Sequence, residues 1–166
     1  IKSSEKTLKN EPVITELDVK LASLDAIRKA LYQVVNDRNG TAYKSRIIQK
    51  YYRMAGKTGT SQVFTISEAE RIQGIIPNEK RKWHRRDHAL FVCYAPIENP
   101  KVAVSVVVEH GGGGSKVAAP IARDIVLQTL YGNDPPSEAY PVKDREKIKL
   151  RQKELRKLRP KLNNIR

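Results

Sequence analysis

Two strand-like apolar runs constrain the fold of this chain most. They are His88–Ala95 and Val102–Glu109, and the short connection between them contains Pro96 and Pro100. Two such runs joined by a turn with paired prolines predict an antiparallel β-hairpin. Residues 55–64 also look extended, because Thr, Val and Phe follow two glycines. The sequence therefore predicts about three strands.

Helical periodicity flanks these strands on both sides. Apolar residues recur at helical spacing from Leu17 to Val35, with Thr15 or Ser23 as the candidate cap and an end near Asp37. After the glycines at 111–114, Ser115 is the candidate cap of a second helix that runs through Leu130. Residues 41–54 carry no clear pattern, and residues 65–87 form a long polar loop. We expect an α+β fold: an antiparallel sheet flanked by N- and C-terminal helices, an incomplete piece that needs more chain.

The charge is concentrated at the end of the chain. The formal net charge of the 166 residues is +14, and residues 143–166 account for +8 of it, whereas residues 89–142 carry −2. We therefore interpret residues 1–133 as the folded body and residues 134–166 as a basic tail, either helical or disordered. A slightly acidic body argues against a basic nucleic-acid-binding face on the fold itself.

Cysteine usage and hydropathy exclude several classes of site. Cys93 is the single cysteine and lies in an apolar run, so we expect a buried thiol, no internal disulfide and no thiolate metal cluster. We predict no cofactor. No apolar run approaches the ~20 residues that cross a bilayer. Any membrane anchor is therefore expected upstream of this chain.

The chemistry concentrates in the segment Lys57-Thr58-Gly59-Thr60-Ser61. On a strand, Thr58 and Thr60 project from one face while Lys57 and Ser61 project from the other. Two hydroxyls and free backbone amides suit a carboxylate and an adjacent carbonyl, and Gly59 lets a ligand approach closely. A phosphate loop would need glycine at position 51, which is Tyr51.

Three other patterns are weaker. His84 and His88 would be metal-like only on one helix and with a third ligand, so we interpret them as part of a polar loop. Residues 80–86 mix basic side chains with Trp83, as single-stranded nucleic-acid binders do, but a solvated loop near a cleft is favoured. The glycines at 111–114 could form an anion nest, although a flexible turn between strand and helix is the plainer interpretation.

The segment Lys57-Thr58-Gly59 is also one of the three motifs of the serine β-lactamase and penicillin-binding superfamily. Over residues 17–132 the chain resembles the transpeptidases of the penicillin-binding protein 2 type. The matching segments are Val34-Val35-Asn36, Gly40-Thr41-Ala42, Met54–Val63, Asp87–Val92, Ala95-Pro96, Val102–Val108, Glu109–Gly112 and Ala118–Leu130.

The resemblance implies roles for the residues of the motif. Lys57 would line the cleft and organise the serine hydroxyls of the site. Thr58 and Thr60, with Gly59 and Ser61 beside them, would bind the terminal carboxylate of the substrate or of a β-lactam. The backbone amide of Thr60 would supply one arm of the oxyanion hole.

The other two motifs of the family do not accompany it. Ser-x-Asn occurs nowhere in the sequence, and the one Ser-x-x-Lys, Ser3 to Lys6, lies in a polar terminus about fifty residues before Lys57. We interpret Ser3 as a coincidental match. Without a serine nucleophile this chain is expected to be inactive alone, as the C-terminal portion of a D,D-transpeptidase.

The family implies a setting as well. We expect peptidoglycan stem peptides as substrate, β-lactams as ligands of the full-length enzyme, and a cell-elongation complex with a glycosyltransferase at the periplasmic face of the inner membrane. Nucleic acid is not expected as a partner. The alternatives are a small basic nucleic-acid-binding or assembly module using residues 80–86 and 143–166, and a serine β-lactamase fragment.

Overall fold

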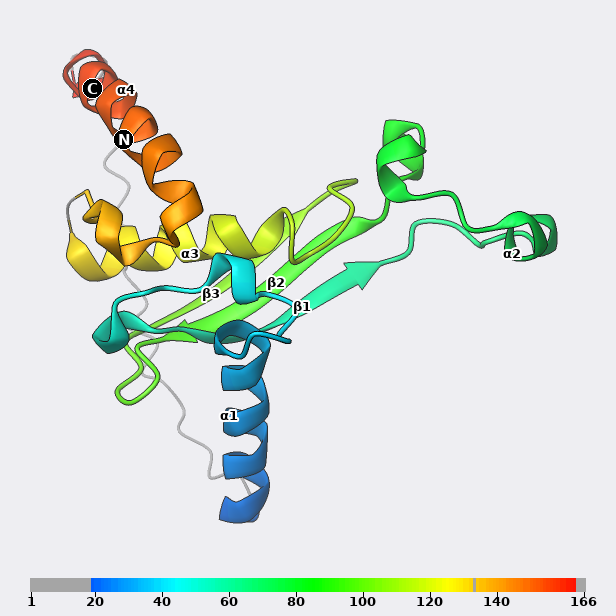
Figure 1. Cartoon of the computed structure of the whole chain (residues 1–166), viewed down its shortest axis with the longest axis horizontal. Helices are drawn as coiled ribbons and strands as arrows, with labels where there is room; N and C mark the ends of the chain where they lie inside the picture. Colours follow the sequence, from blue (N-terminus) through cyan, green and yellow to red (C-terminus); the bar gives the residue numbers. More distant parts are fainter. Residues whose placement is uncertain (1–18, 133, 164–166) are drawn as a thin grey trace, which may run out of the picture.

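A computed structural model describes residues 19–132 and 134–163 (Figure 1). Its centre is a three-stranded antiparallel sheet of order β1-β2-β3, with β1 at Ala55–Ser61, β2 at His88–Ala95 and β3 at Val102–Val108. The predicted hairpin is confirmed, and the first strand ends three residues earlier than predicted. The helices are α1 (Leu21–Asn36), α2 (Glu68–Gln73), α3 (Ala118–Tyr131) and α4 (Arg145–Asn163).

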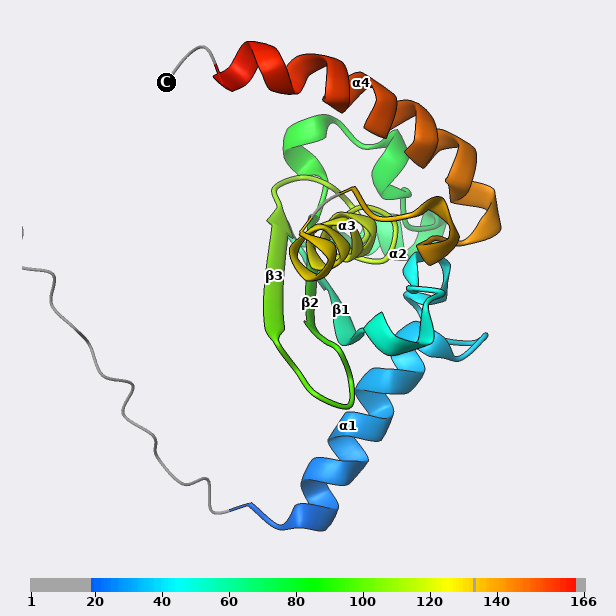
Figure 2. The same ribbon diagram turned by 90° about the vertical axis from the view of Figure 1, so that its left-hand side faces the viewer.

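The sheet has one covered and one bare face. Alternate residues of β2, from Ala89 to Ala95, are buried on the side where α3 lies (Figure 2). On the opposite side Val92 is 50% exposed and Val107 is 59% exposed. An exposed apolar sheet face is unfavourable in water and marks a candidate contact surface. The α+β class is thus confirmed, together with the helices that flank the sheet.

Helix α1 joins the edge of the sheet through its last turn. The Asn36 side-chain amide donates to the Met54 carbonyl at 3.0 Å, just before β1 begins. Leu21 and Ile27, nearer the start of the helix, are 77% and 54% exposed. The predicted Ser23 cap is wrong, because Ser23 already lies inside the helix and its amide bonds to the Lys20 carbonyl. The alternative cap, Thr15, lies outside the described residues.

Helix α3 begins two residues later than predicted, with Val117 in place of Ser115 at its N-cap. Ser115 does not cap it, because residues 114–117 first form a tight turn in which the amides of Lys116 and Val117 bond to the Gly113 carbonyl. The helix ends at Gly132, whose φ of 66° places it in the left-handed region that glycine adopts without strain.

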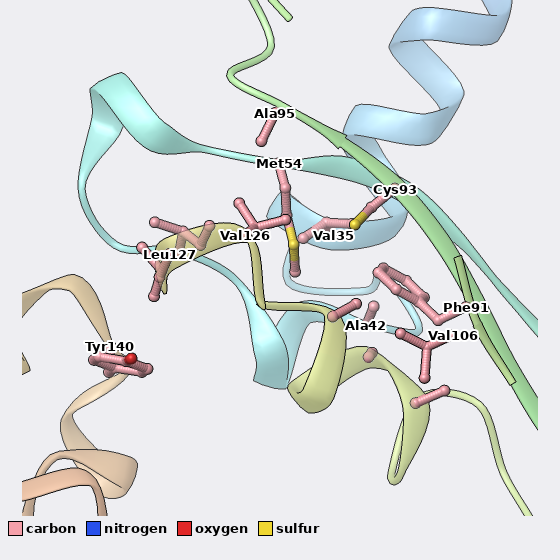
Figure 3. Packing of buried hydrophobic residues seen from close by; sticks show 14 of the residues in the cluster. Val35, Ala42, Met54, Phe91, Cys93, Ala95, Val106, Val126, Leu127 and Tyr140 are labelled. Atoms are coloured by element: carbon pink, nitrogen blue, oxygen red, sulfur yellow. The ribbon is translucent and has the colours of Figure 1, made fainter. Parts of the chain in front are cut away.

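The core lies between the sheet, α3 and the end of α1 (Figure 3). Phe91 and Met54 fill its centre, Val35 contributes from α1, and Val126 and Leu127 contribute from α3, all with no exposed surface. Burying a side chain of this size contributes about 1.5–3 kcal/mol. The helices and strands that frame the site are therefore held together by one apolar cluster.

Cys93 is buried in this core, as predicted, and burial raises the pKa of its thiol to about 12 from 9.0. We expect iodoacetamide at pH 8 to modify Cys93 about two to three orders of magnitude more slowly in the native protein than in urea, because the thiolate is the reactive form. Peptide mapping by mass spectrometry measures this rate. Since the folded pKa is the higher one, the stabilisation from the neutral thiol is present below pH 9 and is lost as the pH rises towards 12. Equal rates in both states would contradict a buried thiol.

Residues 62–87 form an arm that extends from the ends of β1 and β2 (Figure 1). The sequence indicated a polar loop here, but the arm contains α2 and two short 3-10 helices. Ser67 caps α2 by accepting from the Glu70 amide at 3.2 Å. Inside the arm, Arg81 pairs with Glu70 at 2.8 Å, and both side chains are largely buried. The helix is too short for the hydrophobic pattern to reveal it.

Residues 134–163 pack onto α3 and end in α4. Tyr140 and Ile148 are 3% and 6% exposed, and Arg123 on α3, also buried, donates to the Asp144 carboxylate at 2.7 Å. Burial raises the pKa of Tyr140 to about 12. The predicted tail thus contains a helix, and its contact with α3 combines the buried Ile148 with the ion pair between Arg123 and Asp144. No described helix is long and apolar enough to span a membrane.

Candidate functional site

The candidate site lies on β1, the edge strand of the sheet. In the register with β2, Thr58 lies opposite Phe91 and Thr60 opposite Ala89, so both threonines occupy the α3 face. Lys57 and Ser61 lie on the opposite face. Thr60 is exposed and Thr58 is half-buried. The two hydroxyls are thus available to a ligand, and an edge strand leaves part of its backbone amides without a partner in the sheet.

A third hydroxyl joins this pair from the loop after α1. The Thr41 and Thr58 hydroxyl oxygens lie 3.0 Å apart. Gly40 makes the turn possible, because a Cβ there would collide with the carbonyl oxygens of Gln33 and Val34. The sequence placed Thr41 in one of the segments that resemble the family, Gly40-Thr41-Ala42, but gave it no role of its own.

Lys57 is exposed, and its ammonium donates to the Thr58 carbonyl oxygen at 2.8 Å, on its own strand. The side chain projects from the bare face of the sheet, beside Val92. An ammonium on this face can donate hydrogen bonds to polar groups that pack against the face. Within the described residues, no acidic side chain lies within ion-pair distance of Lys57.

The glycine-rich loop packs tightly on the site strand. Gly114 is buried, and a Cβ there would collide with the carbonyl oxygens of Gly59 and Leu90. Gly112 is also buried, and its φ of 85° lies in the left-handed region. The segment is a turn between strand and helix, as predicted, and at Gly114 it also brings two backbones into a contact that only a residue without a Cβ allows.

The histidines do not form a metal site. His84 lies in a short 3-10 helix of the arm, whereas His88 begins β2, so they do not share a helix face. His88 Nδ1 instead accepts the His110 amide at 2.9 Å, and Trp83 stacks edge-on against the His110 ring at 4.5 Å. No group of three or more His, Cys, Asp or Glu suited to a metal occurs in residues 19–132 and 134–163.

The basic run 80–86 is partly engaged within the arm. Arg81 and Arg85 lie over the Phe64 ring, at 4.4 and 5.4 Å from its centroid. The Asn78 amide donates to the Asp87 carboxylate at 2.9 Å, which fixes the base of the arm. The Asp87 carbonyl in turn accepts the Gly112 amide at 2.8 Å, so the arm and the glycine-rich loop are tied together next to β1.

Comparison with known proteins identifies the family to which the chain belongs. Residues 1–127 match the penicillin binding protein transpeptidase domain. The chain belongs to that family. The match covers the sheet and all but the last residues of α3, including the segment Lys57–Thr60 on β1.

Penicillin-binding protein relatives confirm the resemblance to the protein 2 type. The chain is 41% identical over 133 residues to peptidoglycan D,D-transpeptidase MrdA of Haemophilus influenzae, covering 80% of this chain and 20% of that protein. It is 33% identical over 122 residues to MrdA of Escherichia coli, covering 70% of this chain and 18% of that protein. The chain therefore spans about a fifth of the length of these relatives.

Solved penicillin-binding proteins share the fold. Pseudomonas aeruginosa PBP2 in complex with WCK 5153 matches with a TM-score of 0.54 and 34% identity, covering 74% of this chain and 23% of that one. The complex between PBP2 and MreC from Helicobacter pylori matches with a TM-score of 0.51 and 32% identity, covering 67% of this chain and 17% of that one. One relative is thus seen with a small molecule and one with a protein partner.

Proposed function

We propose that this chain is the C-terminal, substrate-binding part of a peptidoglycan D,D-transpeptidase that cross-links stem peptides. The observation that carries this proposal is the pair of accessible threonines on one face of an edge strand, with the Thr41 hydroxyl 3.0 Å from Thr58. At an exposed strand edge, hydroxyl groups and free backbone amides can donate hydrogen bonds to a carboxylate. Family membership supplies the reaction class, acyl transfer.

Each residue of the strand has a role in this proposal. Thr58 and Thr60 bind the carboxylate that ends the stem peptide, with Gly59 and Ser61 lining the same segment. The Thr60 amide donates to the oxyanion that forms when the scissile carbonyl is attacked; such a donor typically contributes about 3–4 kcal/mol to the transition state. Lys57, which projects from the bare face of the sheet, organises by electrostatic attraction the hydroxyls of the chain that covers this face in the full-length enzyme.

The nucleophile lies on chain outside these residues. The sequence contains no Ser-x-Asn, and Ser3, in its one Ser-x-x-Lys, lies outside the described residues. In the full-length enzyme an active-site serine attacks the D-Ala-D-Ala terminus, D-Ala leaves, and the acyl group passes to an amine of a second stem. The bare sheet face at Val92 and Val107, and the exposed start of α1, are the surfaces that the rest of the domain covers.

The setting of the enzyme follows from the same proposal. The domain works at the periplasmic face of the inner membrane, in a cell-elongation complex with a polymerising glycosyltransferase. It takes β-lactams as substrate mimics, because their carboxylate and carbonyl occupy the places of the stem terminus. No metal or other cofactor is needed for serine acyl transfer.

The full-length protein is expected to be labelled covalently by a fluorescent penicillin, and the 166-residue chain is expected to remain unlabelled. The reason is that acylation needs the serine that lies outside the described strand. In-gel fluorescence after denaturation measures this, with boiled protein as the control. Labelling of the 166-residue chain would mean that it holds a nucleophile, with Ser3 the first to test. A full-length protein that resists labelling would contradict the proposed function.

A further inference from the structure

A cavity of about 430 Å³ lies next to the site, and no part of the proposed reaction uses it. It is formed by the loop after α1, the turn before α3 and the short 3-10 helix at 142–144. The turn leads into α3, so the N-terminus of α3, which is the positive end of the helix dipole, lies beside the cavity. The cavity thus lies between residues that match the transpeptidase family and residues of the extension that follows α3.

The lining of this cavity is strongly cationic. Four of its residues are basic, namely Arg38, Lys44, Lys116 and Lys143. Lys116 is paired with Glu79 at 2.7 Å, but both side chains are mostly exposed, and such pairs contribute little. For the other three, no carboxylate among the described residues lies within ion-pair distance. Like charges gathered around one cavity repel each other, so a bound anion would stabilise the arrangement.

The one acidic residue in the lining does not cancel this charge. Asp144 accepts from the buried Arg123 guanidinium at 2.7 Å, and Arg123 also bonds to Asp124 at 3.0 Å. Arg151 also pairs with Asp124 at 3.0 Å, so two guanidinium groups offset the two carboxylates of Asp124 and Asp144. Thr41, Tyr43, Ser45 and Ser115 add hydroxyls to the lining. The combination of several cations with hydroxyl donors suits a ligand with more than one negative oxygen-bearing group.

The cavity is coupled to the site strand by a shared residue. Thr41 lines the cavity, and its hydroxyl lies 3.0 Å from that of Thr58. The loop that carries Thr41 is held in place by the Ala42 amide, which donates to the Val34 carbonyl at 2.9 Å. A ligand in the cavity would therefore contact the residue that orients the carboxylate-binding threonine.

We propose that this cavity binds a peptide that carries two or more carboxylates, next to the Thr58 subsite. Its volume exceeds that of a single phosphate and lies in the range of small-molecule sites. The wall stem peptide is the source of this chemistry, so the proposal rests on the proposed function. The extension after α3 then has a role, since Lys143 completes the cationic lining.

The test uses the full-length protein and a synthetic stem peptide with two free side-chain carboxylates, compared with its amidated form. Calorimetry is expected to show binding at least about tenfold tighter for the carboxylate form at 0.15 M salt. Hydrogen–deuterium exchange is expected to show that the peptide protects residues 38–45 and 113–117. The triple variant Arg38→Gln, Lys44→Gln, Lys143→Gln is expected to lose at least about tenfold in affinity.

A matched variant separates site binding from bulk charge. Lys147→Gln, Lys153→Gln, Lys157→Gln removes the same three charges from the exposed side of α4, outside the cavity, and is expected to change affinity by less than about twofold. Equal losses in both triple variants, equal binding of the amidated peptide, or stronger protection by inorganic pyrophosphate would each overturn the proposal. Penicillin labelling of the same preparation reports the proposed function separately, since it can fail while cavity binding persists.

Discussion

Thr58→Val in the full-length protein is expected to slow acylation by a fluorescent penicillin about 10- to 100-fold. Valine keeps the β-branched shape on β1 and removes only the hydroxyl, so the fold of the strand is preserved. A hydrogen bond to a charged group contributes about 1.5–3 kcal/mol, which corresponds to this range of rates. The second-order rate constant, from labelling over time at several penicillin concentrations, measures the effect.

The matched control is Thr129→Val. Thr129 is exposed on α3, away from β1, and the substitution makes the same chemical change. Its acylation rate is expected to equal that of the wild type. Equal rates for both variants would show that the Thr58 hydroxyl does not bind the carboxylate. A Thr58→Ser variant should recover most of the rate, because the hydroxyl returns.

The strands could be predicted because an apolar run that ends at turn residues is a local signal. The bounds of β2, from His88 to Ala95, agree with the apolar run that ends before Pro96. The placement of Thr58 and Thr60 on one face needs only the two-residue period of a strand. The motif at Lys57 then indicated chemistry without any knowledge of packing.

Other features depend on contacts that a sequence pattern does not show. Helix α4 lacks a full apolar face, and its polar contacts to the body, such as Arg151–Asp124 and Arg156–Asp134, join residues 27 and 22 positions apart. The helix caps failed for a similar reason. Ser115 has the right chemistry for a cap, but the close packing of Gly114 on β1 imposes a turn before α3 can begin.

The site itself was only partly predictable. The role of Thr41 needs a tertiary contact between residues 17 positions apart. The cationic cavity combines Arg38, Lys116 and Lys143, which are widely separated in sequence and meet through the fold. The charge count placed most of the excess in the last residues, so it could not show that one of them lines a cavity beside the motif.

Gly114→Ala is expected to destabilise the domain by about 1–3 kcal/mol or more and to reduce penicillin acylation. The added Cβ would overlap the carbonyl oxygens of Gly59 and Leu90, which are backbone atoms that no rotamer change can move away. Relief requires β1 to shift, and Gly59 lies between Thr58 and Thr60, the two threonines that we propose bind the carboxylate. Stability and acylation should therefore fall together, as measured by urea denaturation and by the labelling rate.

Gly113→Ala is the control at the neighbouring position. A Cβ there has no atom within 4 Å, so the substitution adds the same group without an overlap and also reduces the freedom of the unfolded chain. Its stability is expected to stay within about 1 kcal/mol of the wild type, with unchanged acylation. Two alanine variants with equal stability and equal acylation rates would show that the loop does not press on β1.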